Sequence, residues 1–226
     1  MKTLGDLKHP PSVNELAFDR IKKAIMNREL RQGTIYSENQ LASQLGISKT
    51  PIHNALVILA NKGFVSFLPR RRGFEINELT PKGIEDLYVF RCAVEKCVIE
   101  HIPLPLSDES LKRIGVVQKQ TERAAEEDDR MSFMKADRDL HLCLATLTGN
   151  RHMLFALKDI RDLCDWVGAT ALMKRGDLGR FLEQHKKIIL WLKRGDSQGA
   201  KKAIEKHIQY TKDNALKNIG ALGKGL

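Results

Sequence analysis

The sequence lacks long hydrophobic runs. The longest unbroken apolar stretches are Ala55–Ala60 and Ile188–Leu192, far short of the roughly 18 residues that a helix needs to cross a bilayer. This excludes a membrane-spanning helix. Residues 1–10 carry two lysines with no apolar block behind them, so they do not resemble a secretory signal peptide. We therefore expect a cytoplasmic protein with no membrane contact.

Cysteine is also scarce, with four residues among 226 and no CxxC pair. This excludes a disulfide scaffold and a zinc finger, and it favours reduced thiols. Hydrophobic residues make up 42% of the chain and charged residues 29%, which excludes wholesale disorder. The length suits two domains of roughly 100 to 150 residues each.

The net charge of +10 is distributed unevenly along the chain. Residues 1–78 sum to +5, residues 79–150 to −3 and residues 151–226 to +8. A basic N-terminal segment is compatible with binding to a polyanion such as nucleic acid, although charge by itself is a weak indicator. Whether the protein binds nucleic acid must therefore be judged from its sequence motifs.

Helix-capping signals recur in the N-terminal third. Ser12 is followed three residues later by Glu15, and Ser37 by Gln40, which is the spacing of a capping box. Apolar residues at helical intervals follow each pair. We expect a first helix that runs to about Glu29 and a second, shorter one.

A third helix is expected directly afterwards. Gly46 ends the second helix, Ser48 can cap the third, and Pro51 falls in its first turn, where the missing N–H does no harm. Gly63 then ends it. Two short helices joined by so tight a link are typical of the helix-turn-helix, which places its second helix in the major groove of DNA.

The next segment predicts a β-hairpin with a basic tip. Apolar residues alternate in 65–67 and in 74–76, and the turn between them, Pro69–Gly73, contains three consecutive arginines. Alone, such a turn would be a solvated loop. Beside a helix-turn-helix, arginines that bind phosphates and narrow minor grooves indicate a winged helix-turn-helix. We expect residues 1–78 to form this DNA-binding domain.

The segment Gly33–Ile76 resembles the DNA-binding domain of GntR-family bacterial transcription regulators. Members usually have S-R-T-P-V-R-E-A-L where this chain has S-K-T-P-I-H-N-A-L at 48–56. Lysine and histidine thus replace two arginines that can fork onto guanine, so the customary operator cannot be assumed. The resemblance implies that the residues contacting a double-stranded DNA operator are Ser48, Lys49, Thr50, His53 and Asn54, with Arg70, Arg71 and Arg72 in the wing.

Residues 79–226 predict an all-α helical bundle. Thr80–Pro81 is an N-cap followed by a proline at the first helical position, and no alternating strand pattern reappears after it. The expected helices span 81–101, 107–127, 131–148, 151–174, 177–194 and 197–218. The fold class is therefore mainly α, with a winged helix-turn-helix followed by a bundle.

One carboxylate and three imidazoles are expected to meet inside this bundle. Asp137 and His141 are four residues apart and share the core-facing side of one helix. If the chain reverses at Gly195, His185 and His207 stand at about the same distance from the turn, roughly 16 Å. Each also lies on an apolar stripe, so the two rings should face each other. Such ligands suit a divalent ion such as Zn, Ni or Mn.

The same four residues resemble the metal-ligand set of the all-helical effector domain, the FCD domain, of the FadR-type branch of that family. The resemblance implies a small carboxylate effector held over the metal. Arg91 stands where members often have an arginine near the pocket. Arg91 can fork onto that carboxylate, or it can form a helix-surface pair with Glu95 four residues later; the sequence leaves both open.

These observations predict a homodimeric DNA-binding regulator, a repressor, whose helical domain at 79–226 binds the effector and forms the dimer contact. The alternative is a metal-dependent hydrolytic enzyme that uses the same Asp/His site, with Glu183 or Asp139 as general base. No nucleophile or glycine-rich phosphate loop accompanies the site. We therefore expect no enzyme.

Overall fold

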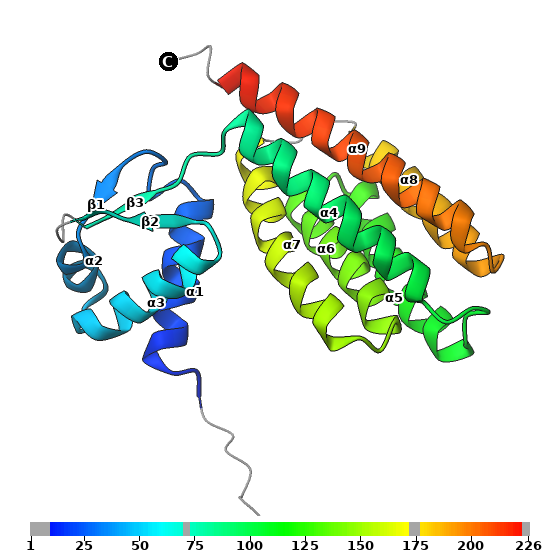
Figure 1. The fold of residues 1–226 in the computed structure, drawn as a ribbon, viewed down its shortest axis with the longest axis horizontal. Helices are drawn as coiled ribbons and strands as arrows, with labels where there is room; N and C mark the ends of the chain where they lie inside the picture. Colours follow the sequence, from blue (N-terminus) through cyan, green and yellow to red (C-terminus); the bar gives the residue numbers. More distant parts are fainter. Residues whose placement is uncertain (1–9, 70–72, 172–176, 223–226) are drawn as a thin grey trace, which may run out of the picture. The chain divides into compact units, whose positions relative to one another are not determined.

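The computed structural model describes residues 10–69, 73–171 and 177–222. The chain divides into two compact units, Met1–Glu78 and Leu79–Leu226 (Figure 1). The first combines helices with a small sheet, and the described part of the second consists of helices and the connections between them. None of the described helices is long and apolar enough to cross a membrane.

Three helices form most of the first unit. They are α1 (Val13–Met26), α2 (Glu38–Leu45) and α3 (Lys49–Asn61). The expected capping boxes are present at the starts of α1 and α2, where a serine side chain and a residue in the first turn satisfy each other's backbone N–H groups. The link between α2 and α3 is therefore as short as the sequence predicts.

Two local details differ from what the sequence suggested. The first helix ends three residues before Glu29, because Arg28 adopts a left-handed φ of 61° and Leu30 turns back into the core. Ser48 occupies the N-cap position of α3 with an extended backbone, but its side chain makes no capping hydrogen bond. Its hydroxyl is therefore not used by the helix that it precedes.

The sheet has three antiparallel strands in the order β1-β3-β2. The predicted hairpin consists of β2 (Val65–Phe67) and β3 (Phe74–Ile76), and a further strand, β1 (Ile35–Tyr36), pairs with the other edge of β3. Gly73 has a φ of 106°, and a Cβ at this position would lie 2.2 Å from the carbonyl oxygen of Tyr36. A side chain at residue 73 would therefore separate the strands.

In the described part of the second unit there are six helices, with ends within four residues of those expected. The predicted end at 174 lies outside the described residues. Their bounds are α4 (Pro81–His101), α5 (Asp108–Glu126), α6 (Arg130–Leu147), α7 (Arg151–Ala171), α8 (Asp177–Lys193) and α9 (Ser197–Leu222). The long helices α4 and α9 lie side by side, and α9 also packs on α8 (Figure 1).

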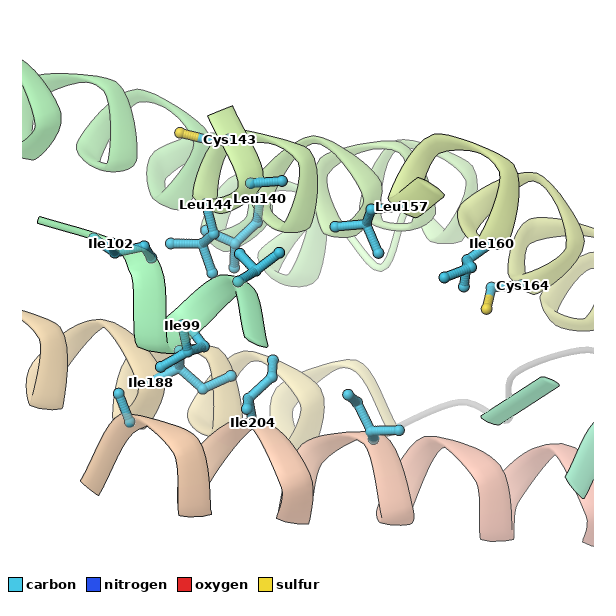
Figure 2. Close-up of a cluster of buried hydrophobic side chains, with 14 of the residues drawn as sticks. Ile99, Ile102, Leu140, Cys143, Leu144, Leu157, Ile160, Cys164, Ile188 and Ile204 are labelled. Atoms are coloured by element: carbon cyan, nitrogen blue, oxygen red, sulfur yellow. The ribbon is translucent and has the colours of Figure 1, made fainter. Parts of the chain in front are cut away.

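Most of the core of the bundle is one large cluster of buried apolar side chains. Figure 2 shows side chains from several helices converging, among them Ile99 of α4, Leu144 of α6, Leu157 of α7 and Ile204 of α9. Each of these four is 2% exposed or less. Burial of apolar surface on this scale fixes the helices, and with them the polar side chains that they carry into the interior.

Candidate metal centre and DNA-contacting surface

The four residues of the expected ligand set converge inside the bundle. Asp137 and His141 lie on α6, His185 on α8 and His207 on α9, and one donor atom from each lies within 4.8 Å of all the others. The three histidines are each 1% exposed. Four side chains spread over about 70 residues of sequence thus enclose one small volume.

The two histidines on either side of the Gly195 turn face each other as the spacing predicts. The ring centroids of His185 and His207 are 4.7 Å apart, and that of His141 lies 5.7 Å and 5.2 Å from them. The Nε2 atoms of His185, His141 and His207 lie 3.0, 3.6 and 4.0 Å from Oδ1 of Asp137. All three rings therefore present the same nitrogen to one carboxylate oxygen.

The outer nitrogen of His141 is fixed by a buried acid. Nδ1 of His141 donates to Oε2 of Glu95, and Oε1 of Glu95 accepts from Nε of Arg91 at 2.7 Å. Burial alone would raise the pKa of Glu95, but His141 and Arg91 hold it at about 2. An ionised Glu95 can only accept, so His141 directs the lone pair of Nε2 into the cluster when it is neutral.

Burial lowers the pKa of His185 and, well below its usual range, that of His207. Both imidazoles are therefore neutral near pH 7. Nδ1 of His207 donates to the side-chain oxygen of Gln184 at 3.1 Å. Nε2 of His185 and Nε2 of His207 are buried and form no hydrogen bond within the described part of the chain. Two unpartnered nitrogens thus point at Asp137.

Arg161 on α7 is a member of the site that the sequence analysis missed. Its guanidinium pairs with Oδ2 of Asp137, and despite burial this pairing and His141 hold the pKa of Asp137 well below its usual range. The Nε and Nη1 groups of Arg161 are buried without a hydrogen-bond partner among the described residues. Its place between Leu157 and Cys164 on an apolar stripe is the signal that could have found it.

Arg91 forms the pair with Glu95 that the sequence left open, but this pair is buried and not on the helix surface. The two side chains are 1% and 3% exposed. Nη2 of Arg91 also lies 3.3 Å from Nε2 of His141. Arg91 therefore borders the cluster directly, and pairing with Glu95 does not remove it from the site.

In the first unit, the expected DNA-contacting residues share one exposed face of α3. Pro51 and Ile52 face the core, as do Ala55, Leu56 and Leu59. The residues of 48–56 that remain exposed are Ser48, Lys49, Thr50, His53 and Asn54. The three wing residues Arg70, Arg71 and Arg72 lie outside the described residues.

Comparison with known families assigns both units. The family model of bacterial regulatory proteins, gntR family, matches residues 13–76, and the FCD domain model matches residues 86–210. The chain belongs to the GntR family. It is a transcription regulator with an N-terminal helix-turn-helix and a C-terminal FCD domain, and regulators of this family bind DNA.

Individual relatives agree with this assignment. An uncharacterized HTH-type transcriptional regulator, YdhC of Bacillus subtilis, is 26% identical over 92% of both chains. The gluconate operon transcriptional repressor of Bacillus licheniformis is 24% identical over 78% of this chain and 74% of its own. The solved structure of E. coli McbR/YncC has the same fold, with a TM-score of 0.74 and 18% identity over 95% and 99% of the two chains.

The enzymatic alternative is not supported by these relatives, which are transcriptional regulators and not enzymes. The positions of the two suggested general bases, Glu183 and Asp139, also give no support to an enzyme. The Glu183 side chain is 62% exposed and pairs with Lys186, and Asp139 is not one of the clustered donors.

Proposed function

We propose that this regulator is a repressor whose FCD domain binds a divalent metal ion and a small carboxylate metabolite, and that these ligands alter its affinity for operator DNA. The observation that carries the proposal is the buried cluster of Asp137, His141, His185 and His207. Its donors converge within 4.8 Å, and three of its imidazole nitrogens, Nδ1 and Nε2 of His185 and Nε2 of His207, have no hydrogen-bond partner among the described residues.

The donor set fits a divalent ion such as Zn, Ni or Mn. Neutral imidazole nitrogen and carboxylate oxygen are the ligands that these metals accept. Asp137, His141, His185 and His207 would hold the ion, with Glu95 and Gln184 orienting two of the rings from behind. A bound ion would act as a Lewis acid to which a carboxylate oxygen of the effector could bind.

The charges around the cluster favour an anionic effector. Glu95 is balanced by Arg91 and Asp137 by Arg161, so a divalent ion would leave these groups net positive. The Nε and Nη1 atoms of Arg161 have no acceptor among the described residues and belong to the guanidinium that pairs with Asp137, and guanidinium donors match carboxylates well. We therefore assign Arg91 and Arg161 to effector binding.

The exposed face of α3 and the residue that precedes it are proposed to contact the operator through Ser48, Lys49, Thr50, His53 and Asn54, and Arg70, Arg71 and Arg72 are proposed to contact it as well. A homodimer is proposed because one helix-turn-helix recognises only one half-site. Val89 and Phe90 on α4 are 66% and 54% exposed, which supports a contact through the helical unit. Effector and operator must then alter each other's affinity by the same factor.

The test begins with selection of duplexes from a random library by the full-length protein. Operator affinity is then measured with metal and with a panel of mono-, di- and tricarboxylates, for the wild type and for His185→Ala. The proposal expects at least one carboxylate to change operator affinity in the wild type and to have no effect in the variant. Loss of thermal stability in His185→Ala with an unchanged carboxylate response would show a purely structural metal.

A further inference from the structure

One acidic side chain pairs with both basic residues at the start of α3. Oε1 of Glu38 lies 2.8 Å from Nδ1 of His53, and Oε2 lies 3.2 Å from Nζ of Lys49. The Glu38 side chain is 15% exposed, whereas those of His53 and Lys49 are 53% and 61% exposed. A largely covered acid thus holds two exposed groups of the proposed operator-contacting surface.

The position of Glu38 keeps its carboxyl group ionised. Glu38 is the first residue of α2, which Ser37 caps, and the N-terminus of a helix favours negative charge. Burial raises the pKa of Glu38, but hydrogen bonds from His53 and Lys49 outweigh it and hold the pKa below its usual value. An ionised carboxylate has no proton to donate.

This pairing determines which nitrogen of His53 carries the proton. Because Glu38 only accepts, Nδ1 of His53 is the donor, and in the neutral imidazole Nε2 then bears the lone pair. The ring also packs near Phe67 of β2, and the two ring centroids lie 5.7 Å apart. His53 and Phe67 line a hollow of about 620 Å³. Nε2 of the neutral ring can therefore accept a hydrogen bond from a bound molecule.

We propose that Glu38 determines the specificity of operator recognition by making His53 a hydrogen-bond acceptor, so that residue 53 selects the amino group of adenine or cytosine. In the major groove only adenine N6 and cytosine N4 donate, whereas guanine presents two acceptors. The arginine that the family usually has at this position would select guanine. The inference rests on the proposed contact between α3 and duplex DNA.

The experiment uses the full-length protein at about pH 8, so that few protons are available to charge imidazoles. Duplexes are selected from a random library by the wild type and by His53→Ala, and the base pair whose preference disappears in His53→Ala marks the contact. That base is then replaced by an analogue without its amino group, purine for adenine or 2-pyrimidinone for cytosine. The wild type should bind the analogue duplex about tenfold more weakly than the natural duplex. For His53→Ala and Glu38→Ala the two affinities should differ by less than about twofold.

Lys49→Gln is the matched control, because it removes the other partner of Glu38 and leaves His53 paired. It should bind all duplexes more weakly and keep the tenfold ratio, and thermal unfolding should confirm that every variant is folded. If the wild type enriches no duplex, the proposed DNA binding itself fails, and this inference with it. Three results would overturn the inference alone while duplexes are still enriched. His53→Ala could select the same bases as the wild type, or the wild type could bind duplexes with and without the amino group equally well. Glu38→Ala could also keep the wild-type ratio of affinities for those two duplexes.

Discussion

At the scale of single residues, the centre depends on side chains that do not belong to the four donors. Glu95 accepts from both Arg91 and His141, so it neutralises one buried cation and fixes one ring. Arg161 of α7 balances the negative charge of Asp137 through an ion pair. These partners hold Asp137 and His141 in place inside a low-dielectric interior.

Glu95→Gln should weaken metal binding by roughly 10- to 100-fold, because an amide no longer fixes the proton of His141 on Nδ1. The measurement is a competition titration with a chromophoric chelator. Glu100→Gln is the control on the same helix, since Glu100 is exposed and pairs with Lys201 at the surface. Equal affinities for the two variants would contradict the role assigned to Glu95.

At the scale of elements, the antiparallel pair α8–α9 brings His185 opposite His207, and its turn depends on Gly195. This residue has a φ of 73°, and a Cβ there would meet nothing within 4 Å. Gly195→Ala should therefore destabilise the fold by about 1 kcal/mol through backbone strain alone. Urea unfolding measures the change.

Gly115 provides the matched control. It lies within α5, a Cβ would again meet nothing within 4 Å, and its φ is not positive. Gly115→Ala should stabilise the protein by about 0.5 to 1 kcal/mol, because alanine is the better helix former. Stabilisation by Gly195→Ala as well would mean that the turn is not left-handed.

Elements with strong local signals were predictable from the sequence. Capping pairs and prolines at helix starts located the helices, and counting residues from the Gly195 turn placed His185 opposite His207. The sequence did not reveal β1, which is two residues long and exists only because β3 offers an edge. Nor did it reveal the pairs of Arg161 with Asp137 and of Glu38 with His53, because these join separate helices and leave no periodic trace.

At the scale of the whole molecule, metal binding is expected to contribute to the stability of the fold. Chelation should lower the midpoint of thermal unfolding, because an ion that binds only the folded protein stabilises it, by an amount that grows with the logarithm of the free ion concentration above the Kd. Scanning calorimetry of chelated and metal-reloaded protein checks this. An unchanged midpoint would mean that the cluster holds no ion in the folded state.

The proposed dimer is tested by sedimentation equilibrium. The wild type should sediment as a dimer, and Phe90→Asp together with Val89→Asp should shift it towards the monomer, because these substitutions place charge on an apolar contact. Substitution of Met131, which is 72% exposed on α6, serves as the control. A monomeric wild type, or an unaffected double variant, would contradict a dimer formed through α4.

The most direct test of the central claim is the metal content of protein purified without chelator or nickel resin, measured by elemental analysis together with anomalous diffraction. The account predicts about one divalent ion per chain in the wild type, with an anomalous peak between Asp137, His141, His185 and His207, and its loss in His185→Ala. Two results would contradict this prediction. The wild-type protein could contain no ion after reloading with Zn, Ni and Mn in turn, or the anomalous peak could lie elsewhere and persist in His185→Ala.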